Sequence, residues 1–359
     1  MARILYAAGT YAHIKSFHTD YIDALKSEGH EVVVMANGEG ADINVAFEKK
    51  MLSPKNLKCQ KRLKKIFKAE KFDCILLNTT LAAFNVRMAL SKKNRPRVVN
   101  LMHGFMFGEN PSGLKERIFL LAESFLKPKT DSIIVMNEED LHSANKYSLT
   151  KGEIVKIRGM GASVPPATTT PSEIRKKLLC ENSYVIVFTG ELCDKKNQKQ
   201  LISILPRLKE YIPDAVLWLL GSGGMEEELR DLAKKMKVED SVVFTGYVNA
   251  PQDYILAADL YVSPSKKEGL PFNIIEALGI AKPIIASNIK GHRDLIEDKV
   301  TGLLYDNNSD EDLLEKILSV YSGSVSFDKE KQIETYGEYS KKEVFEETFE
   351  VMKRLLKLP

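Results

Sequence analysis

The chain has 359 residues, 44% of them hydrophobic, which is too long for one ordinary domain and supplies apolar side chains for two cores. A formal net charge of only +3 does not indicate a nucleic-acid-binding protein, and we predict no nucleic-acid partner. Four cysteines without a Cys-x-x-Cys pair or zinc spacing favour a reduced, cytoplasmic protein.

The first half of the chain alternates strand and helix patterns. Apolar strand patterns at residues 3–8 and 31–36 enclose a helical pattern at residues 17–28, an opening typical of a parallel sheet. Residues 37–40, Asn-Gly-Glu-Gly, favour a turn over a phosphate loop. Further short strands are predicted at residues 72–78, 98–102 and 132–136.

Residues 49–71 stand out by charge, with ten Lys or Arg side chains and one acid, Glu70. The pattern predicts a basic amphipathic helix, which either contacts anionic lipid headgroups or is a solvated face; both interpretations stay open. No apolar run is long enough to span a bilayer, so we expect any contact with the inner face of the plasma membrane to be peripheral. The apolar residues that interrupt the charges are Leu57, Leu63, Ile66 and Phe67.

Residues 113–129 form a second amphipathic segment with basic ends. Its apolar stripe has helical spacing, and we expect core packing to account for it more simply than membrane insertion. The stripe consists of Leu114, Ile118, Leu121 and Phe125.

A Pro- and Thr-rich segment at residues 163–171 is the clearest linker, and strand–helix alternation restarts after it. Strands are predicted at 184–189, 215–220, 242–245, 259–262, 283–286 and 302–305, with helices at 197–211, 225–236 and 341–356. The sequence therefore predicts an α/β protein of two Rossmann-like, doubly wound domains that face each other, with the ligand at the carboxyl ends of the strands. The predicted domains are residues 1–165 and 166–340, and residues 341–359 form a last helix.

Residues 263–278 carry the most chemical information. They pass from a strand through a Glu-Gly-Leu-Pro bend into a helix, which places Glu268 at the helix start and Glu276 about one and a half turns inside. Free N–H groups there suit a diphosphate, and carboxylates accept hydrogen bonds from sugar hydroxyls. Spacing alone favours a nucleotide-sugar site no more than a strand–turn–helix unit with two surface glutamates.

Two lysines, Lys195 and Lys196, open a helix soon after the strand that Gly190 closes. Cations at that end oppose the helix dipole, which favours a bound phosphate over a solvated helix start. Residues 221–224, Gly-Ser-Gly-Gly, form a tight turn that close packing alone would explain.

His103 ends a strand of the first domain, and His13, Lys15 and His18 follow the first strand, after Gly9. In this architecture the carboxyl ends of strands line the ligand side, where His103 would hydrogen-bond a sugar, although a lone histidine is more often structural.

We expect no metal and no cofactor. Residues 310–312, Asp-Glu-Asp, are interpreted as the acidic start of a helix. Residues 306–310 lack the glycine and the terminal glutamate of a calcium loop, and Asp310 is better explained as a helix cap.

The pair Glu268-x7-Glu276 within PSKKEGLPFNIIEAL resembles the motif of retaining GT-B glycosyltransferases of family 4 (glycosyltransferase group 1). The resemblance covers nearly the whole chain and is specific for the family but not for the sugar. Four further segments are similar to a capsule and exopolysaccharide branch of it: HIKSFHTDYIDALKSEGHEVVVMANG, NLMHGF, FTGELCDKKNQKQLI and ASNIKGHRDLIEDKVTGLLYD.

The resemblance implies a donor site in the second domain. Glu268 would approach the sugar hydroxyls, Glu276 would bind the ribose, and Lys196 would hold the diphosphate. The backbone of Gly269, Leu270, Pro271 and Phe272 would lie near the sugar and phosphates, and residues 244–248, including Gly246 and Tyr247, would flank the base. Gly190 and Lys195 complete the donor set, and His103 joins Glu268 and Lys196 as the catalytic set. The acceptor side consists of Gly9, His13, Lys15 and His18. The last helix, residues 341–359, would cross back and pack on the first domain.

The resemblance also implies the reaction. A hexose or N-acetylhexosamine would pass from a nucleotide sugar, expected to be UDP-linked, to a saccharide on a polyprenyl diphosphate, with retention and without metal, in surface-polysaccharide synthesis. Glu191 stands where many relatives have an arginine that binds the diphosphate, so Lys195 or Arg293 would help Lys196 to bind it. Residues 13–15 stand where many relatives have a Gly-Gly loop. A UDP-amino-sugar epimerase of the same fold and a non-catalytic scaffold remain alternatives.

Overall fold

The computed structural model describes residues 1–48 and 53–358, and the chain divides into two units. Unit 1 comprises Met1–Gly161 and Lys341–Pro359, and unit 2 comprises Ala162–Ser340. The first residues of the predicted basic segment, 49–52, lie outside the described residues. In the described part of the chain, no helix combines the length and the apolar character that a bilayer crossing requires.

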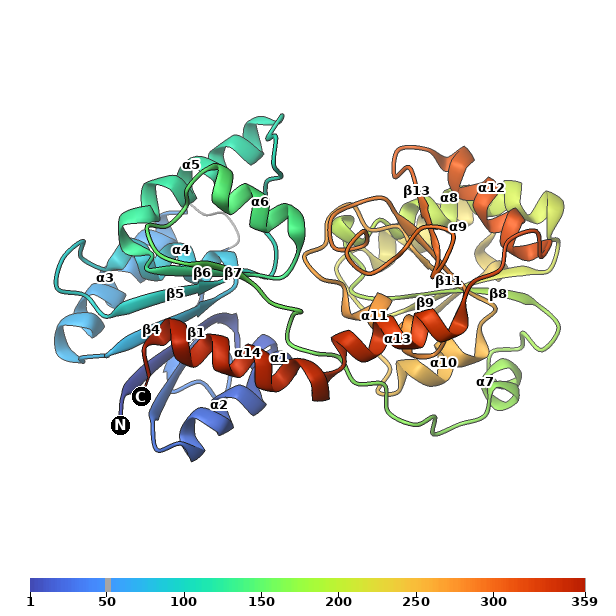
Figure 1. Ribbon diagram of the computed structural model, residues 1–359. Helices are drawn as coiled ribbons and strands as arrows, with labels where there is room; N and C mark the ends of the chain where they lie inside the picture. The colour runs from blue at the N-terminus through green and yellow to red at the C-terminus, as the bar shows by residue number, and fades with distance from the viewer. Residues whose placement is uncertain (49–52, 359) are drawn as a thin grey trace. The chain divides into compact units, whose positions relative to one another are not determined.

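Unit 1 is built on a parallel sheet with the strand order β3-β2-β1-β4-β5-β6-β7 (Figure 1). The order grows outward in both directions from the central pair β1 and β4, which confirms the predicted doubly wound α/β fold. The strands are β1 (Arg3–Thr10), β2 (Glu31–Asn37), β3 (Ile43–Asn44), β4 (Cys74–Asn78), β5 (Arg97–Leu101), β6 (Ser132–Val135) and β7 (Ile154–Lys156).

Helices cover both faces of this sheet, with α3, α4 and α5 on one face and α1, α2 and α14 on the other (Figure 1). The single helix predicted at residues 17–28 is two helices, because Thr10 caps an earlier start by accepting a hydrogen bond from the backbone N–H of His13. The helices are α1 (Tyr11–Phe17), α2 (Thr19–Ser27), α3 (Pro54–Ala69), α4 (Thr80–Ala89), α5 (Leu114–Leu126), η1 (Lys127–Lys129), α6 (Glu138–Lys146) and α14 (Lys341–Leu356).

The last helix, α14, is part of unit 1 although unit 2 precedes it in the chain. Its residues Val344 and Met352 are fully buried, and Phe345 lies against Tyr21 with ring centroids 4.7 Å apart. The hydroxyl of Thr348 donates to the backbone oxygen of Gly159 at 3.2 Å. Burial of this apolar face at roughly 25 cal/mol per Å² stabilises the unit.

The expectation that the apolar stripe of α5 packs into the core is wrong. Leu114, Ile118, Leu121 and Phe125 are between 47% and 78% exposed. The opposite face packs instead, because buried Glu123 forms a two-bonded ion pair with buried Arg87 of α4, each N···O distance being 2.8 Å. A buried ion pair fixes the rotation of the helix and leaves the stripe outside.

Unit 2 repeats the architecture with a second parallel sheet, in the order β10-β9-β8-β11-β12-β13, which grows outward from β8 and β11. Its strands are β8 (Tyr184–Thr189), β9 (Ala215–Leu220), β10 (Val242–Gly246), β11 (Leu260–Ser263), β12 (Ile284–Ser287) and β13 (Leu303–Tyr305). Its helices are α7 (Pro171–Lys177), η2 (Asp194–Lys196), α8 (Gln198–Tyr211), α9 (Glu226–Lys235), η3 (Glu239–Ser241), α10 (Pro251–Ala257), α11 (Phe272–Gly279), α12 (Asp310–Tyr321) and α13 (Lys329–Tyr339).

The start of α12 differs in detail from the prediction. Ser309, not Asp310, is the cap, and its hydroxyl accepts from the N–H of Asp312 at 3.0 Å. Asp310 is the first helical residue and accepts from the side chain of Gln200 at 2.9 Å. The acidic group therefore serves the helix start and a side-chain contact.

Candidate functional site

The chemical groups of unit 2 meet where β8 and β11 end. These two strands are adjacent. After β8 the chain continues to β9 on one side of the pair, and after β11 it continues to β12 on the other side. In doubly wound folds, ligands bind at the point where the strand order reverses in this way. Gly190 follows β8, and the loop after Ser263 leads into α11. This edge therefore collects residues that are far apart in the sequence.

Glu268 is held between two lysines at this edge. Lys196 Nζ donates to Glu268 Oε1 at 2.7 Å, and Lys195 Nζ lies 3.4 Å from Oε2. The glutamate is only 7% exposed. Burial opposes its ionisation, but the charges of Lys196 and Lys195 outweigh burial and lower the pKa of Glu268 to about 2. At neutral pH this carboxylate can only accept hydrogen bonds.

Backbone contacts fix the loop that carries Glu268. The N–H of Lys266 donates to the carbonyl oxygen of Lys195 at 2.8 Å, which ties the two loops together. Gly291 has φ +82°, and a Cβ there would lie 2.5 Å from the oxygen of Gly269, so only glycine fits. The loop that carries Glu268 is thus held by the Lys195 backbone before this residue and by the Gly291 backbone after it.

His292 was not among the predicted site residues, although the quoted segment ASNIKGHRDLIEDKVTGLLYD contains it. It is fully buried beside the loop, with Nε2 3.3 Å from the hydroxyl of Ser263 and Nδ1 2.8 Å from the backbone oxygen of Ser287. Burial lowers its pKa to about 4, so the ring is neutral at neutral pH. We assign it a positioning role, since its contacts are with the loop and the strand ends.

The helix α11 begins after Pro271, which makes no capping hydrogen bond, and in the first turn the side-chain oxygen of Asn273 accepts from the N–H of Ile274 at 3.0 Å. The side chain of Asn273 in the first turn donates to the backbone oxygen of Thr189 at 2.9 Å, which seats the helix against the end of β8. Glu276 lies one turn further along, and its carboxylate has no hydrogen-bond partner within the described ranges 1–48 and 53–358. Burial raises the pKa of Glu276 to about 7.

A cavity of about 330 Å³ adjoins this edge at the ends of β8, β9 and β10. Gly221 on its wall packs against the backbone of Gly190, where a Cβ would lie 2.1 Å from the oxygen of Gly190. Gly221 and Ser222 thus line the cavity, although the pattern Gly-Ser-Gly-Gly alone was explained by close packing. The lining residues are Thr189, Gly190, Glu191, Leu220, Gly221, Ser222, Tyr247, Val248 and Pro251.

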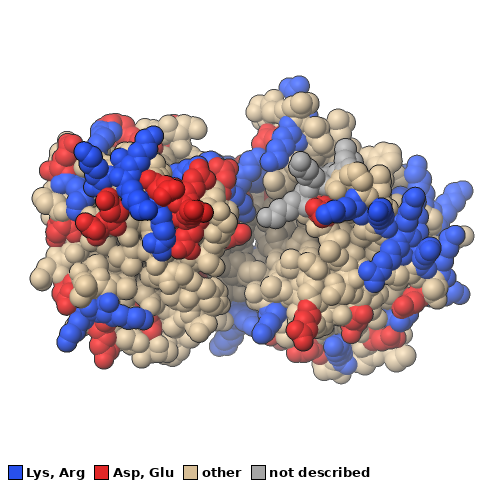
Figure 2. Space-filling view, turned by 180° about the vertical axis from the view of Figure 1, so that it is seen from behind, with Lys and Arg blue, Asp and Glu red and all other residues tan. Residues whose placement is uncertain are grey.

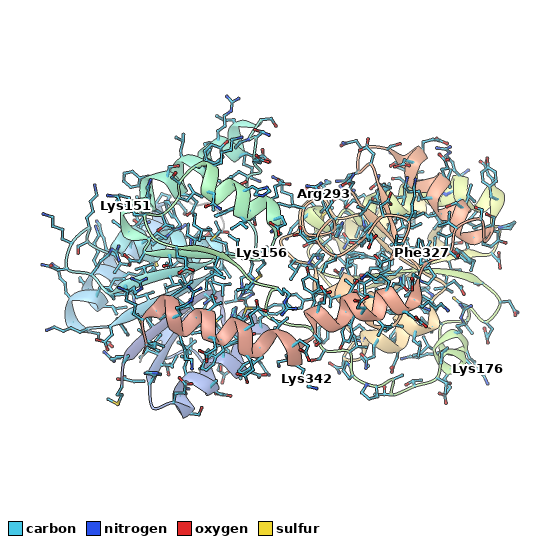
Figure 3. All side chains as sticks on the ribbon, viewed as in Figure 1. Lys151, Lys156, Lys176, Arg293, Phe327 and Lys342 are labelled. Carbon is cyan, nitrogen blue, oxygen red and sulfur yellow. The ribbon has the colours of Figure 1, made fainter. Side chains whose placement is uncertain are left out.

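The structure brings most predicted donor residues together in unit 2. The loops at the strand ends carry Gly190, Lys195, Lys196, Glu268 and Gly269. The backbone oxygen of Gly246 accepts a hydrogen bond of 2.9 Å from the N–H of Gly221, which packs against Gly190. Leu270 and Pro271 lead into α11 and are buried. Arg293, labelled in Figure 3, is exposed, and its guanidinium donates to the side-chain oxygen of Asn288 at 3.3 Å.

The predicted residues of unit 1 form a separate group, which we call the three-histidine cluster: His13, His18 and His103. His13 Nε2 lies 3.3 Å from His103 Nε2 and 3.2 Å from His18 Nε2, and His18 Nδ1 bonds with the buried hydroxyl of Tyr6 at 2.8 Å. Burial lowers the pKa of His13 to about 4 and those of His18 and His103 well below the usual value. Of the described residues, these three form the one His, Cys, Asp or Glu group close enough to hold a metal ion.

Two other predicted residues of unit 1 are placed differently. Lys15 is exposed and makes no side-chain contact with the three-histidine cluster, and the N–H of Gly9 donates to the hydroxyl of Thr79 at 2.9 Å. Thr79, which follows β4, has φ +73°, rare for a β-branched residue. Such strain is common at ligand sites, and no sequence signal marked this position.

A basic and apolar surface covers part of unit 1. Lys and Arg side chains gather over the part of unit 1 that carries α3 (Figure 2). Lys58, Lys61, Lys64, Lys65 and Lys68 are exposed and form no ion pair with the described residues. A groove of about 580 Å³ between α3 and the end of α4 is lined by Lys64, Phe67, Lys68, Met88, Ala89, Leu90, Ser91, Asn94, Arg95, Pro96 and Lys129.

Two family models match the chain. The model for glycosyl transferases group 1 matches residues 170–343, and the model for glycosyltransferase family 4 matches residues 18–158. The two matches cover the donor-side edge of unit 2 and much of unit 1.

Individual relatives agree with these matches. The chain is 31% identical over 315 residues to EpsD of Bacillus subtilis, a protein named as a glycosyltransferase, and covers 83% of its length with 84% of its own. It is 25% identical over 279 residues to the Escherichia coli UDP-Gal:alpha-D-GlcNAc-diphosphoundecaprenol alpha-1,3-galactosyltransferase, with 76% of this chain and 72% of that protein covered. HepE of Anabaena, solved with UDP and glucose, matches with a TM-score of 0.76 and 18% identity over 99% of this chain and 100% of its own, a likeness of fold.

Proposed function

Because this chain belongs to family 4 of the glycosyltransferases, the group 1 enzymes, and has their GT-B fold, we propose that it transfers a hexose or N-acetylhexosamine from a UDP-sugar to a saccharide acceptor. The transfer retains the anomeric configuration and serves the synthesis of a surface polysaccharide. The observation that carries the proposal is the placement of Glu268 between Lys195 and Lys196 at the strand ends of unit 2.

The donor is bound by unit 2 in this proposal. Lys196 has three N–H groups, so it can keep its bond to Glu268 and also donate to the diphosphate. Glu268 offers its remaining lone pairs to hydroxyls of the sugar. Glu276, half-buried and without a described partner, accepts from the ribose hydroxyls, and the cavity beside Tyr247 takes the base.

The chemistry follows from charge. The bond to the anomeric carbon breaks as negative charge develops on the leaving UDP, and the ammonium of Lys196 together with the start of α11 stabilises that charge. Glu268 is paired with two lysines and is therefore a poor nucleophile. The acceptor oxygen attacks from the face that the diphosphate leaves, and this attack keeps the anomeric configuration.

The acceptor is a saccharide linked to a lipid diphosphate, and unit 1 is the side that contacts the anionic membrane. The exposed stripe of α5 and the unpaired lysines of α3 support this assignment, since apolar insertion and headgroup attraction together give stable surface binding. The name of the galactosyltransferase relative, which includes a diphosphoundecaprenol acceptor, agrees with it.

The test is an assay with purified protein, a panel of UDP-sugars and a polyprenyl-diphosphate-linked N-acetylglucosamine acceptor. We expect UDP release together with a lipid product one sugar heavier, and the anomeric configuration follows from NMR of that product. Conversion of a UDP-sugar without acceptor would instead identify an epimerase. Binding of UDP-sugars without turnover across a broad acceptor panel would identify a non-catalytic scaffold.

A further inference from the structure

We propose that the three-histidine cluster of unit 1 is a binding site for one divalent transition metal ion of the zinc class, held by the Nε2 atoms of His13, His18 and His103. The family resemblance implied a catalytic role for His103 and acceptor contacts for His13 and His18, but metal binding by these rings is measured without any sugar transfer and so is tested separately from the transferase function. It departs from the sequence-based expectation that the protein uses no metal.

The distances between the nitrogens suit such an ion. Zinc binds histidine at about 2.0–2.1 Å in tetrahedral sites, which separates neighbouring ligand nitrogens by roughly 3.3–3.4 Å. Two Nε2 pairs already lie at 3.2 and 3.3 Å. The ligand nitrogens of all three residues lie within 4.8 Å of one another, so closing around the ion needs only small ring rotations.

Hydrogen bonding alone satisfies this arrangement poorly. The Nε2 atom of each ring has only the Nε2 atoms of its neighbours as partners among the described residues. A ring nitrogen carries either one proton or one lone pair, so His13 Nε2 must use a single N–H or a single lone pair for two neighbours. A cation at the centre would engage three lone pairs at once, each along its own axis.

A supporting contact orients the most buried ligand. His18 is fully buried, and its Nδ1 lies 2.8 Å from the hydroxyl of buried Tyr6. When Nδ1 donates to this oxygen, the lone pair of Nε2 is free for a metal, which is the usual outer contact of a metal-bound histidine.

Partial exposure of two of the three rings would let a fourth ligand reach the ion. His13 and His103 are half-buried, whereas His18 closes the far side. Three neutral imidazoles would leave the full +2 charge of the ion, so the fourth ligand should be an anionic oxygen, such as hydroxide or a phosphate oxygen. Three histidines with one open position are typical of zinc sites that bind an exchangeable ligand.

The test uses the full chain after dialysis against EDTA. Calorimetric titration with Zn²⁺ should give one site per chain, and Co²⁺ should give the visible absorption of tetrahedral coordination. His13→Gln and His103→Gln should each weaken Zn²⁺ binding by at least about 100-fold, while circular dichroism confirms that both variants stay folded. Exposed His142→Gln and half-buried Cys193→Ser are the matched controls and should bind Zn²⁺ unchanged.

Absence of stoichiometric Zn²⁺ binding in the parent chain would overturn the proposal. So would equal affinity in the parent and the His13→Gln/His103→Gln double variant, because the ion would then be held elsewhere. Either result leaves the UDP-sugar assay untouched, so failure of the metal site and failure of the transferase function can be told apart.

Discussion

Lys196 is the residue on which the proposed chemistry depends most. Removing a preorganised charge from the leaving group costs about 10²–10³ in rate, so Lys196→Met should lower kcat/KM for the UDP-sugar by that factor. Steady-state kinetics checks this, with Lys199→Met as control, because Lys199 lies three residues along and pairs with exposed Glu228. Equal losses in both variants, or no loss in either, would contradict the role of Lys196.

Glu276 predicts a pH dependence of donor binding. Its pKa near 7 means that the carboxyl is mostly protonated at pH 6 and mostly ionised at pH 8. If ribose binding needs the carboxylate, the affinity for UDP should rise about tenfold between these pH values. Calorimetry with UDP measures this, and Glu276→Gln should bind weakly without the slope. A parent protein whose UDP affinity is flat from pH 6 to 8 would rule out this role.

The raised pKa of Glu276 also affects the stability of the fold, which should fall with rising pH whereas the affinity for UDP should rise. The folded pKa lies above the unfolded value of 4.5, so Glu276 contributes stability below pH 4.5 that is lost as pH rises to about 7. The loss is about 3 kcal/mol and should be absent in Glu276→Gln. Trp218, the single tryptophan and fully buried in unit 2, reports urea unfolding of this unit by fluorescence.

At the scale of elements, α5 combines an anchored inner face with an exposed apolar outer face. A fully buried Leu or Phe contributes about 1.5–3 kcal/mol, so partial insertion of α5 should make each serine substitution at Leu121 or Phe125 weaken liposome binding roughly tenfold. Flotation with vesicles containing anionic lipid measures this. Leu179→Ser is the control, because Leu179 is 85% exposed but lies in unit 2.

The basic residues of α3 provide a second test of membrane binding by unit 1. Charge reversal at Lys64 and Lys68 should weaken binding further, and more strongly at low salt. Vesicle binding unchanged by both the serine and the charge-reversal variants would dismiss unit 1 as the membrane side.

The orientation of α5 could not be predicted from its sequence pattern. The helix carries apolar residues on two faces, and the pattern ranks neither above the other. The deciding contact, Arg87 with Glu123, joins residues 36 positions apart. The strands β3 and β7 were missed because two or three residues give no periodicity. The long strands and α14 were found because their apolar runs are complete within one segment.

In the candidate sites, too, the roles of single residues could be predicted, whereas contacts between distant residues could not. Lys196 and Glu268 lie 72 residues apart. The local pattern associated Lys196 with a phosphate and Glu268 with sugar hydroxyls, and the family resemblance made these roles specific. No pattern indicated that they would form an ion pair. His13 and His103 lie 90 residues apart, so spacing could not indicate that their rings meet. Thr79 lies in no motif, and His292 lies in a family-like segment that does not single it out. The importance of both follows from backbone conformation and burial, which only the fold supplies.

At the scale of the whole molecule, the contribution of α14 to unit 1 predicts an unequal effect of truncation. Deleting residues 341–359 should expose the apolar surface that Val344 and Met352 cover and speed hydrogen exchange in β4 and β5 by tenfold or more. The urea midpoint reported by Trp218 should stay unchanged, because unit 2 keeps all its residues. An equal fall of that midpoint would mean that the two units unfold as one.

This division of the chain also matters during synthesis. The ribosome completes the first 161 residues early, yet unit 1 lacks a helix for its sheet until all of unit 2 has been made. The face that α14 will cover, including Tyr21, therefore remains exposed to solvent or to a chaperone while about 180 further residues are added. We expect nascent chains to acquire a stable unit 2 before a stable unit 1, the reverse of their order along the chain.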